Sequence, residues 1–198
     1  MRVLLVAFAL LLAACDQSGT PPGAPGGQPP VVTEIDVRTE FNAGLGTLVV
    51  ASQGAACSPF LPSRLTPERP ARAAQLYPNP AVGSFAVDFQ VDQTSRVRVF
   101  AVPAVGPGAC TPPRLSASAI TAPYGGLAAF LLADQTLPSG RHVVTGGFTG
   151  DFPEATPWPA GFYRVYVESA SRLDFVDLLV VDPLRPPPGA CQYLALSC

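Results

Sequence analysis

The chain has 198 residues, of which 48% are hydrophobic and only 13% are charged, and its formal net charge is −2. Binding to nucleic-acid phosphates requires a clustered basic surface, so this composition argues against nucleic acid as a partner. A chain of this length holds one sizeable domain or two small ones. Its 24 prolines and 18 glycines favour many turns without reaching the level of wholesale disorder.

The first residues have the pattern of an export signal. Arg2 is followed by an apolar run, Val3 to Leu12, that is too short to cross a bilayer core, which needs about 20 apolar residues. The end of this segment, Leu12-Ala13-Ala14-Cys15, resembles the lipobox of bacterial lipoprotein signal peptides. The resemblance implies that residues 1–14 are a signal peptide, and that Cys15 carries a diacylglycerol thioether and an acylated amine. The alternative is an ordinary signal peptide that contains a cysteine.

Lipidation at Cys15 would anchor the protein in a membrane of the cell envelope, because two or three acyl chains bind stably where one binds only marginally. Which membrane leaflet holds the anchor stays open. Residues 15–30 are rich in proline and glycine and cannot bury a core. We therefore expect them to be a flexible tether between the membrane and a folded part.

The remaining cysteines are Cys57, Cys110, Cys191 and Cys198. An even set in an exported chain predicts two disulfides, with three possible pairings, of which Cys57–Cys110 with Cys191–Cys198 is favoured. A zinc site is the competing interpretation, but no two cysteines have the close spacing that zinc sites favour. We expect no metal and no cofactor.

Alternation of apolar and polar residues predicts many short strands. Residues 31–75 contain two of them, within 31–40 and 46–52, and then a connecting loop. The further strands are expected at 84–91, 95–102, 114–121, 126–133, 141–145, 162–168 and 173–181. No helical periodicity of useful length occurs, so the sequence predicts an all-β fold of the antiparallel sandwich type.

Three finer expectations concern side chains on these strands. In 84–91, Phe85, Val87, Phe89 and Val91 should face inward, with Asp88 outward. Arg96 and Arg98 on the next strand are expected to face Asp88 across one sheet. The run 178–181 is apolar on both sides, which predicts a centrally placed strand.

Three motifs in order resemble the C-terminal domains of type IX secretion cargo: Gln75-Leu76-Tyr77-Pro78-Asn79-Pro80, residues 137–145 and residues 159–166. The last two also resemble the immunoglobulin-like module of flagellar hook-capping proteins. The resemblance implies an immunoglobulin-like sandwich over residues 76–182, with 183–198 as a proline- and cysteine-rich extension. It further implies a sorting or assembly role. The prolines of the first motif fix φ, so the chain is expected to enter its first strand extended.

No catalytic residue is predicted. His142, the single histidine, occupies a strand position where a packed or hydrogen-bonded histidine is expected, and Ser139 nearby lacks a nucleophile elbow. Asp174 and Asp177 should lie on opposite faces of one strand, and Asp151 and Glu154 lie in a Gly/Pro-rich loop, so neither pair is arranged for acid–base chemistry. The chain is therefore not expected to be an enzyme.

Four aromatic residues cluster in the sequence as a possible binding patch: Phe152, Trp158, Phe162 and Tyr166. Aromatic side chains serve interfaces and cores alike, so an exposed patch and a cap on the sandwich end are equally supported. The resulting expectation is a lipid-anchored, non-enzymatic module that binds an envelope protein or carbohydrate, or has a structural role there. The alternative is a sorting or assembly module related to type IX secretion.

Overall fold

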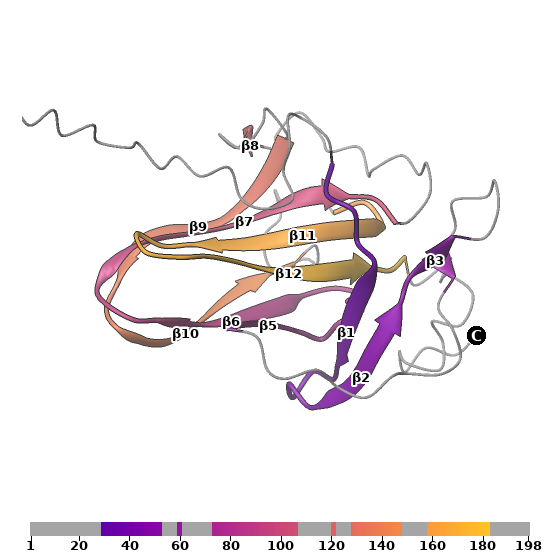
Figure 1. The fold of residues 1–198 in the computed structure, drawn as a ribbon, viewed down its shortest axis with the longest axis horizontal. Helices are drawn as coiled ribbons and strands as arrows, with labels where there is room; N and C mark the ends of the chain where they lie inside the picture. The colour runs from indigo at the N-terminus through magenta and orange to yellow at the C-terminus, as the bar shows by residue number, and fades with distance from the viewer. Residues whose placement is uncertain are drawn as a thin grey trace, which may run out of the picture.

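A computed structural model describes residues 29–52, 59–60, 73–106, 120–121, 128–147 and 158–182. The secondary structure of these segments consists of strands, as predicted (Figure 1). The strands are β1 (Glu34–Arg38), β2 (Gly44–Val49), β3 (Ala51–Ser52), β4 (Pro59–Phe60), β5 (Ala74–Tyr77), β6 (Phe85–Val91), β7 (Ser95–Ala104), β8 (Ile120–Thr121), β9 (Ala128–Leu137), β10 (Gly140–Gly146), β11 (Gly161–Glu168) and β12 (Leu173–Val180).

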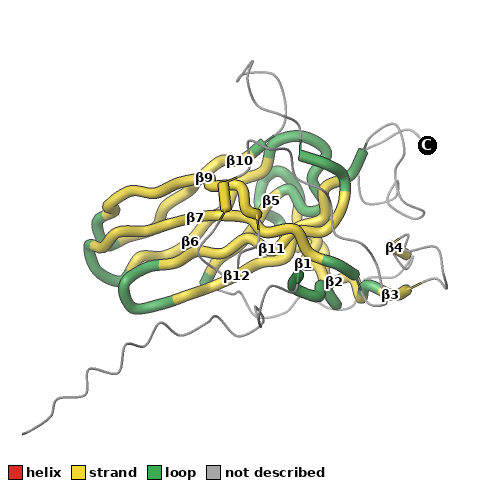
Figure 2. The backbone as a smooth tube through the Cα atoms, turned by 90° about the horizontal axis from the view of Figure 1, so that it is seen from above, coloured by secondary structure: helices red, strands yellow, loops and turns green. Residues whose placement is uncertain are grey.

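Two antiparallel sheets form the predicted immunoglobulin-like sandwich. One sheet has the order β10-β6-β5, and the other has the order β12-β11-β7-β9-β8. Along the sequence, the chain therefore passes from one sheet to the other after β6, after β9 and after β10. This distribution matches the strand pattern of immunoglobulin-like sandwiches, with β12, β11 and β7 as neighbouring strands of the larger sheet. Figure 2 shows the long strands running along the molecule and joined by loops at its two ends.

The main core lies between the sheets because inward-facing residues alternate along each strand. The predicted inward side chains of β6 are at most 3% exposed. They meet side chains of β7, β11 and β12 that are also buried: Val97, Val99, Ala101, Tyr163, Val165, Val167, Val176, Leu178 and Val180. Period-two alternation thus correctly predicted which side chains of β6 enter the core.

A tyrosine fixes the entry of β11 into this core. Tyr163, the third residue of the GFY turn-to-strand segment, is fully buried, and its hydroxyl donates a hydrogen bond of 2.7 Å to the carbonyl of Pro159. A tyrosine near the start of this strand that bonds upstream backbone is a hallmark of immunoglobulin-like domains. Burial raises the pKa of Tyr163 above its ordinary value, and burial also raises that of Tyr166.

These raised pKa values predict a loss of stability in alkali. Above about pH 10 the unfolded tyrosines ionise while the buried ones stay neutral, so the free energy of unfolding falls as the pH rises. Tyr163→Phe should cost about 1 kcal/mol at pH 8 through the lost hydrogen bond, and should weaken the alkaline loss. Urea unfolding of both proteins at pH 8 and pH 11 measures this. Equal alkaline losses in the two proteins would contradict it.

The N-terminal hairpin β1–β2 is packed onto the outer side of the larger sheet, as its place beside β12 in Figure 1 indicates. Its buried residues form a second core with residues of the sandwich: Val32, Ile35, Val37, Leu48 and Val50 with Ala104, Phe162, Leu179 and Val181. Along β1, the buried Ile35 and Val37 alternate with partly exposed Glu34, Asp36 and Arg38. Before it, Val32 is buried and Val31 is 49% exposed, because the backbone there pairs with Val105.

Two expectations about strand placement are corrected. β12 is not central but forms an edge of its sheet. It is apolar on both faces because Leu178 enters the main core while Leu179 is covered by the hairpin. Arg96 and Arg98 do not face Asp88, since β6 and β7 belong to different sheets; they pair with Asp134 and Glu168.

The YPNP motif, Tyr77-Pro78-Asn79-Pro80, also lies at a different place in the fold than expected. The first strand of the sandwich, β5, begins before the motif and ends at Tyr77, so Pro78, Asn79 and Pro80 form the connection from β5 to β6. The bonds Tyr77–Pro78 and Asn79–Pro80 are both cis. The motif therefore places a turn at this point of the fold rather than the start of a strand.

Candidate functional site

Of the four aromatic residues predicted as a patch, the three that the structure describes are distributed over three buried clusters. Trp158 is 7% exposed and packs against Phe85, Phe130 and Tyr163, with a centroid distance of 4.3 Å to Phe130. Phe162 and Tyr166 are 6% and 2% exposed and belong to the hairpin core and to a third cluster on the outer face of the larger sheet.

These three residues therefore do not share an exposed surface, and Trp158 packs inside the main core. The reason is strand geometry: Phe162 and Tyr166 point away from the core that holds Trp158, because side chains alternate along β11. Phe152 lies outside the described residues.

His142 is packed and hydrogen-bonded, as expected. Its ring lies 6.0 Å from that of Phe89, and its Nε2 is 2.9 Å from the carbonyl oxygen of Pro138. Asp174 and Asp177 lie on opposite faces of β12, where they pair with Arg172 and Arg164. Asp151 and Glu154 lie outside the described segments.

Two buried polar groups tie the N-terminal part of the chain to the sandwich. The side chain of Asn79 is fully buried and donates hydrogen bonds of 2.9 and 2.8 Å to the carbonyls of Asp36 and Asp177. Its oxygen accepts from the backbone N–H of Leu179 at 3.2 Å. Arg164 forms a two-pronged ion pair with Asp177, at 2.7 and 3.0 Å, and also donates to the carbonyl of Val31.

This arrangement is structural rather than open to a ligand. Arg164 and Asp177 are 8% and 9% exposed, and the guanidinium lies 4.3 Å above the ring of Phe175. Burial lowers the pKa of Arg164 and the pairing with Asp177 raises it, with a net rise. All the polar contacts described above for Arg164 and Asp177 are made with other groups of the protein.

A polar surface that is open to solvent lies instead on the outer face of the smaller sheet. The register pairs Gln75 of β5 with Asp88 of β6, and Gln90 of β6 with Arg141 of β10. These four residues point away from the core because their neighbours along each strand point into it. We call Gln75, Asp88, Gln90 and Arg141 the polar face.

A buried charge organises the polar face. The side chain of Asp88 is 6% exposed, and both of its oxygens accept from the Nε of Arg141, at 2.7 and 3.0 Å. The Nη2 of Arg141 also bonds to Asp88, and the Arg141 side chain is 66% exposed. The hydrogen bond and the charge of Asp88 both raise the pKa of Arg141. The sequence predicted Asp88 to be outward but missed Arg141 as its partner.

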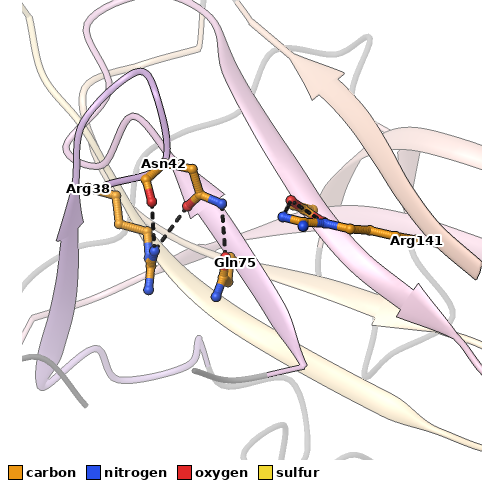
Figure 3. Close-up of polar contacts among 5 residues, drawn as sticks. Arg38, Asn42, Gln75 and Arg141 are labelled. Atoms are coloured by element: carbon orange, nitrogen blue, oxygen red, sulfur yellow. Dashed lines mark hydrogen bonds and ion pairs between the residues drawn. The ribbon is translucent and has the colours of Figure 1, made fainter. Parts of the chain in front are cut away.

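The turn of the N-terminal hairpin extends this network. Figure 3 shows Arg38 bonded to Asn42, and Asn42 bonded to Gln75, beside the ion pair of Arg141. The Asn42 amide donates to the Gln75 oxygen at 2.9 Å. Asn42 has a left-handed φ of 60°, a conformation that asparagine tolerates better than most residues. Segments far apart in sequence are thus joined along one polar surface.

The polar face borders a hollow of about 370 Å³ lined by Ala73, Gln75, Asp88, Phe89, Gln90 and Arg141. A second hollow of about 250 Å³ lies on the other sheet, beside Arg96, Arg98 and Glu168. The arginines there are paired with Asp134 and Glu168, as Arg141 is with Asp88, but no carboxamide side chain of the described residues lines this second hollow. The first hollow combines amide, carboxylate and guanidinium groups in one place, so it is the better candidate for binding.

Several predicted features lie outside the residues that the structure describes. They are the signal peptide, the lipidation site Cys15, the tether up to residue 28, the cysteines Cys57, Cys110, Cys191 and Cys198, and the C-terminal extension. Within the described segments, no group of three or more His, Cys, Asp or Glu side chains is placed to hold a metal ion. The same segments contain no helix that could span a membrane.

Comparison of the chain with models of protein families, with curated proteins and with solved structures finds no match.

Proposed function

We propose that the protein is a lipid-anchored, non-enzymatic binding module of the cell envelope. The single observation that carries the binding role is the polar face, an ordered and solvent-open set of hydrogen-bonding groups beside a hollow. The lipobox-like segment ending at Cys15 supports the anchor, and the proline- and glycine-rich residues up to 30 support a spacer. A rigid sandwich that presents polar groups at the end of a tether suits recognition of another envelope component.

The chain provides a matched pair of variants to test this function. Gln75→Ala with Gln90→Ala removes two amides from the polar face. Gln93→Ala with Gln135→Ala removes two amides from exposed positions in the β6–β7 loop and on β9. Both doubles delete the same atoms, so their effects on solubility should be alike.

The full-length protein, solubilised in mild detergent and immobilised, is incubated with a detergent extract of the envelope. We expect the wild type and the Gln93/Gln135 double variant to retain the same component, and the Gln75/Gln90 double variant to retain less than half as much. Retention no higher than on bare support would reject a binding role. Equal retention by all three proteins would place the site elsewhere on the molecule.

The order of the three sorting-domain-like motifs favours a second candidate, a role in type IX-like sorting or assembly. In that case a reporter fused to Leu76–Cys198 leaves the periplasm, whereas a reporter that stays inside rejects this role. Each motif also has a structural position here: the first forms the β5–β6 connection, and the other two contain the starts of β10 and β11.

A further inference from the structure

We propose that the polar face binds a neutral saccharide. This inference rests on the proposed binding function and names its ligand class. The outer side of the smaller sheet presents planar polar groups at two levels, with Gln75 beside Asp88 and Gln90 beside Arg141. Carboxylate, carboxamide and guanidinium groups each offer paired hydrogen-bonding atoms, and adjacent hydroxyls on a sugar ring are a matching pair of donors and acceptors.

The charge of the polar face favours a neutral ligand. Asp88 and Arg141 are held together by two-pronged hydrogen bonds, so their charges cancel at the centre of the face. An anionic ligand would have to compete with a carboxylate that is already seated on the guanidinium. A hydroxyl group both donates and accepts, so it can bond to either member of the pair without separating them.

The polar face also retains hydrogen-bonding capacity. The Nη1 of Arg141 makes no hydrogen bond within the described part of the chain, where its contacts run through Nε and Nη2. Gln75 uses its oxygen to hold Asn42, which leaves its amide N–H groups directed elsewhere. The amide of Gln90 has one long contact of 3.4 Å, to the carbonyl of Val91. Within the segments that the structure describes, these groups therefore keep hydrogen-bonding capacity for a ligand.

Apolar side chains lie beside the polar groups. They can pack against the C–H groups on one face of a sugar ring. Val143 is paired with Asp88 across the strands and is 51% exposed. Tyr77 lies on the same side of β5 as Gln75, opposite the small Ala86. Aromatic and aliphatic groups that flank a few placed polar groups are a common composition of ligand sites.

An extended peptide is the competing ligand. Peptides that add to a sheet are recognised through backbone hydrogen bonds along an edge strand. The groups gathered here are instead side chains on the face of the sheet, and two of them, Asp88 and Gln90, belong to its central strand, β6. The geometry therefore favours a ligand that is recognised by side chains alone.

The test uses the full-length protein in detergent micelles and a printed array of neutral and uronic-acid-containing oligosaccharides. The neutral oligosaccharide with the strongest signal is then titrated by calorimetry against the wild type and both double variants. Loss of two hydrogen bonds should weaken the affinity of the Gln75/Gln90 double variant about tenfold or more, and the Gln93/Gln135 double variant should stay within about twofold of the wild type. Matching circular dichroism spectra confirm that the variants are folded.

Several outcomes overturn the saccharide assignment. They are binding of acidic oligosaccharides alone, no binding to the array, and equal weakening in the two double variants. A further readout separates this inference from the proposed function. If the envelope component retained in the pull-down is not displaced by the neutral oligosaccharide, the assignment fails and the binding function stands. If no component is retained, the binding function itself fails.

Discussion

Replacing Asn79 by alanine is expected to lower the free energy of unfolding by about 4 kcal/mol. The variant removes three hydrogen bonds at a fully buried position and leaves the carbonyls of Asp36 and Asp177 and the N–H of Leu179 without the partner they had. Each buried backbone group left unpaired costs about 1–3 kcal/mol. The midpoint of urea unfolding measures the change.

Gln93→Ala is the control, because it removes a carboxamide from an exposed loop and should change stability by no more than about 0.5 kcal/mol. A loss below about 1 kcal/mol for Asn79→Ala would contradict the role assigned to this side chain. That role is to hold β1 and β12 against the β5–β6 connection, so its loss should loosen the segment nearest to the proposed membrane tether.

Breaking the buried ion pair should have an effect of similar size. Arg164→Met or Asp177→Leu alone is expected to cost about 3–5 kcal/mol, because each leaves a buried charge without its partner. The double variant should lose less than either single one, since no isolated charge remains. A deficit of about 1 kcal/mol should persist because Arg164 also donates to the carbonyl of Val31.

A double-mutant cycle by urea unfolding measures this coupling. Losses that add up in the double variant would show that the two charges do not stabilise each other. Because Arg164 also contacts Val31, loss of the ion pair should also affect the residues around Val31. Arg164 joins β11 to the residues that lead to the tether, so the single variants should also speed proteolysis near Val31 relative to the double variant.

The sequence predicted the fold class and the inward side chains of β6, because a sheet with one buried face imposes a period of two on each strand. Alternation does not encode which strands pair, and the wrong expectations follow from that limit. Arg96 and Arg98 were placed opposite Asp88 as if β6 and β7 were neighbours, yet the chain crosses to the other sheet between them. In the same way, the edge position of β12 depends on cover by a hairpin more than 120 residues away in sequence.

The candidate site was less predictable than the fold. The sequence groups Phe162 and Tyr166 with Trp158, but alternation along β11 turns both of them away from the core that holds Trp158. The polar face combines residues from β5, β6 and β10, and only the three-dimensional register brings Gln75, Asp88 and Arg141 together. In the YPNP motif the prolines suggested a structural role, whereas Asn79 between them makes the hydrogen bonds that join three parts of the chain.

The most direct test of a lipid-anchored envelope module is mass spectrometry of the N-terminal peptide of the native protein after detergent phase partition. We expect the protein in the detergent phase, with a mature chain that begins at Cys15 and carries a diacylglyceryl group on its sulfur and an acyl group on its amine. A native protein in the aqueous phase, with an unmodified Cys15, would contradict the anchor and with it the place proposed for this protein in the cell.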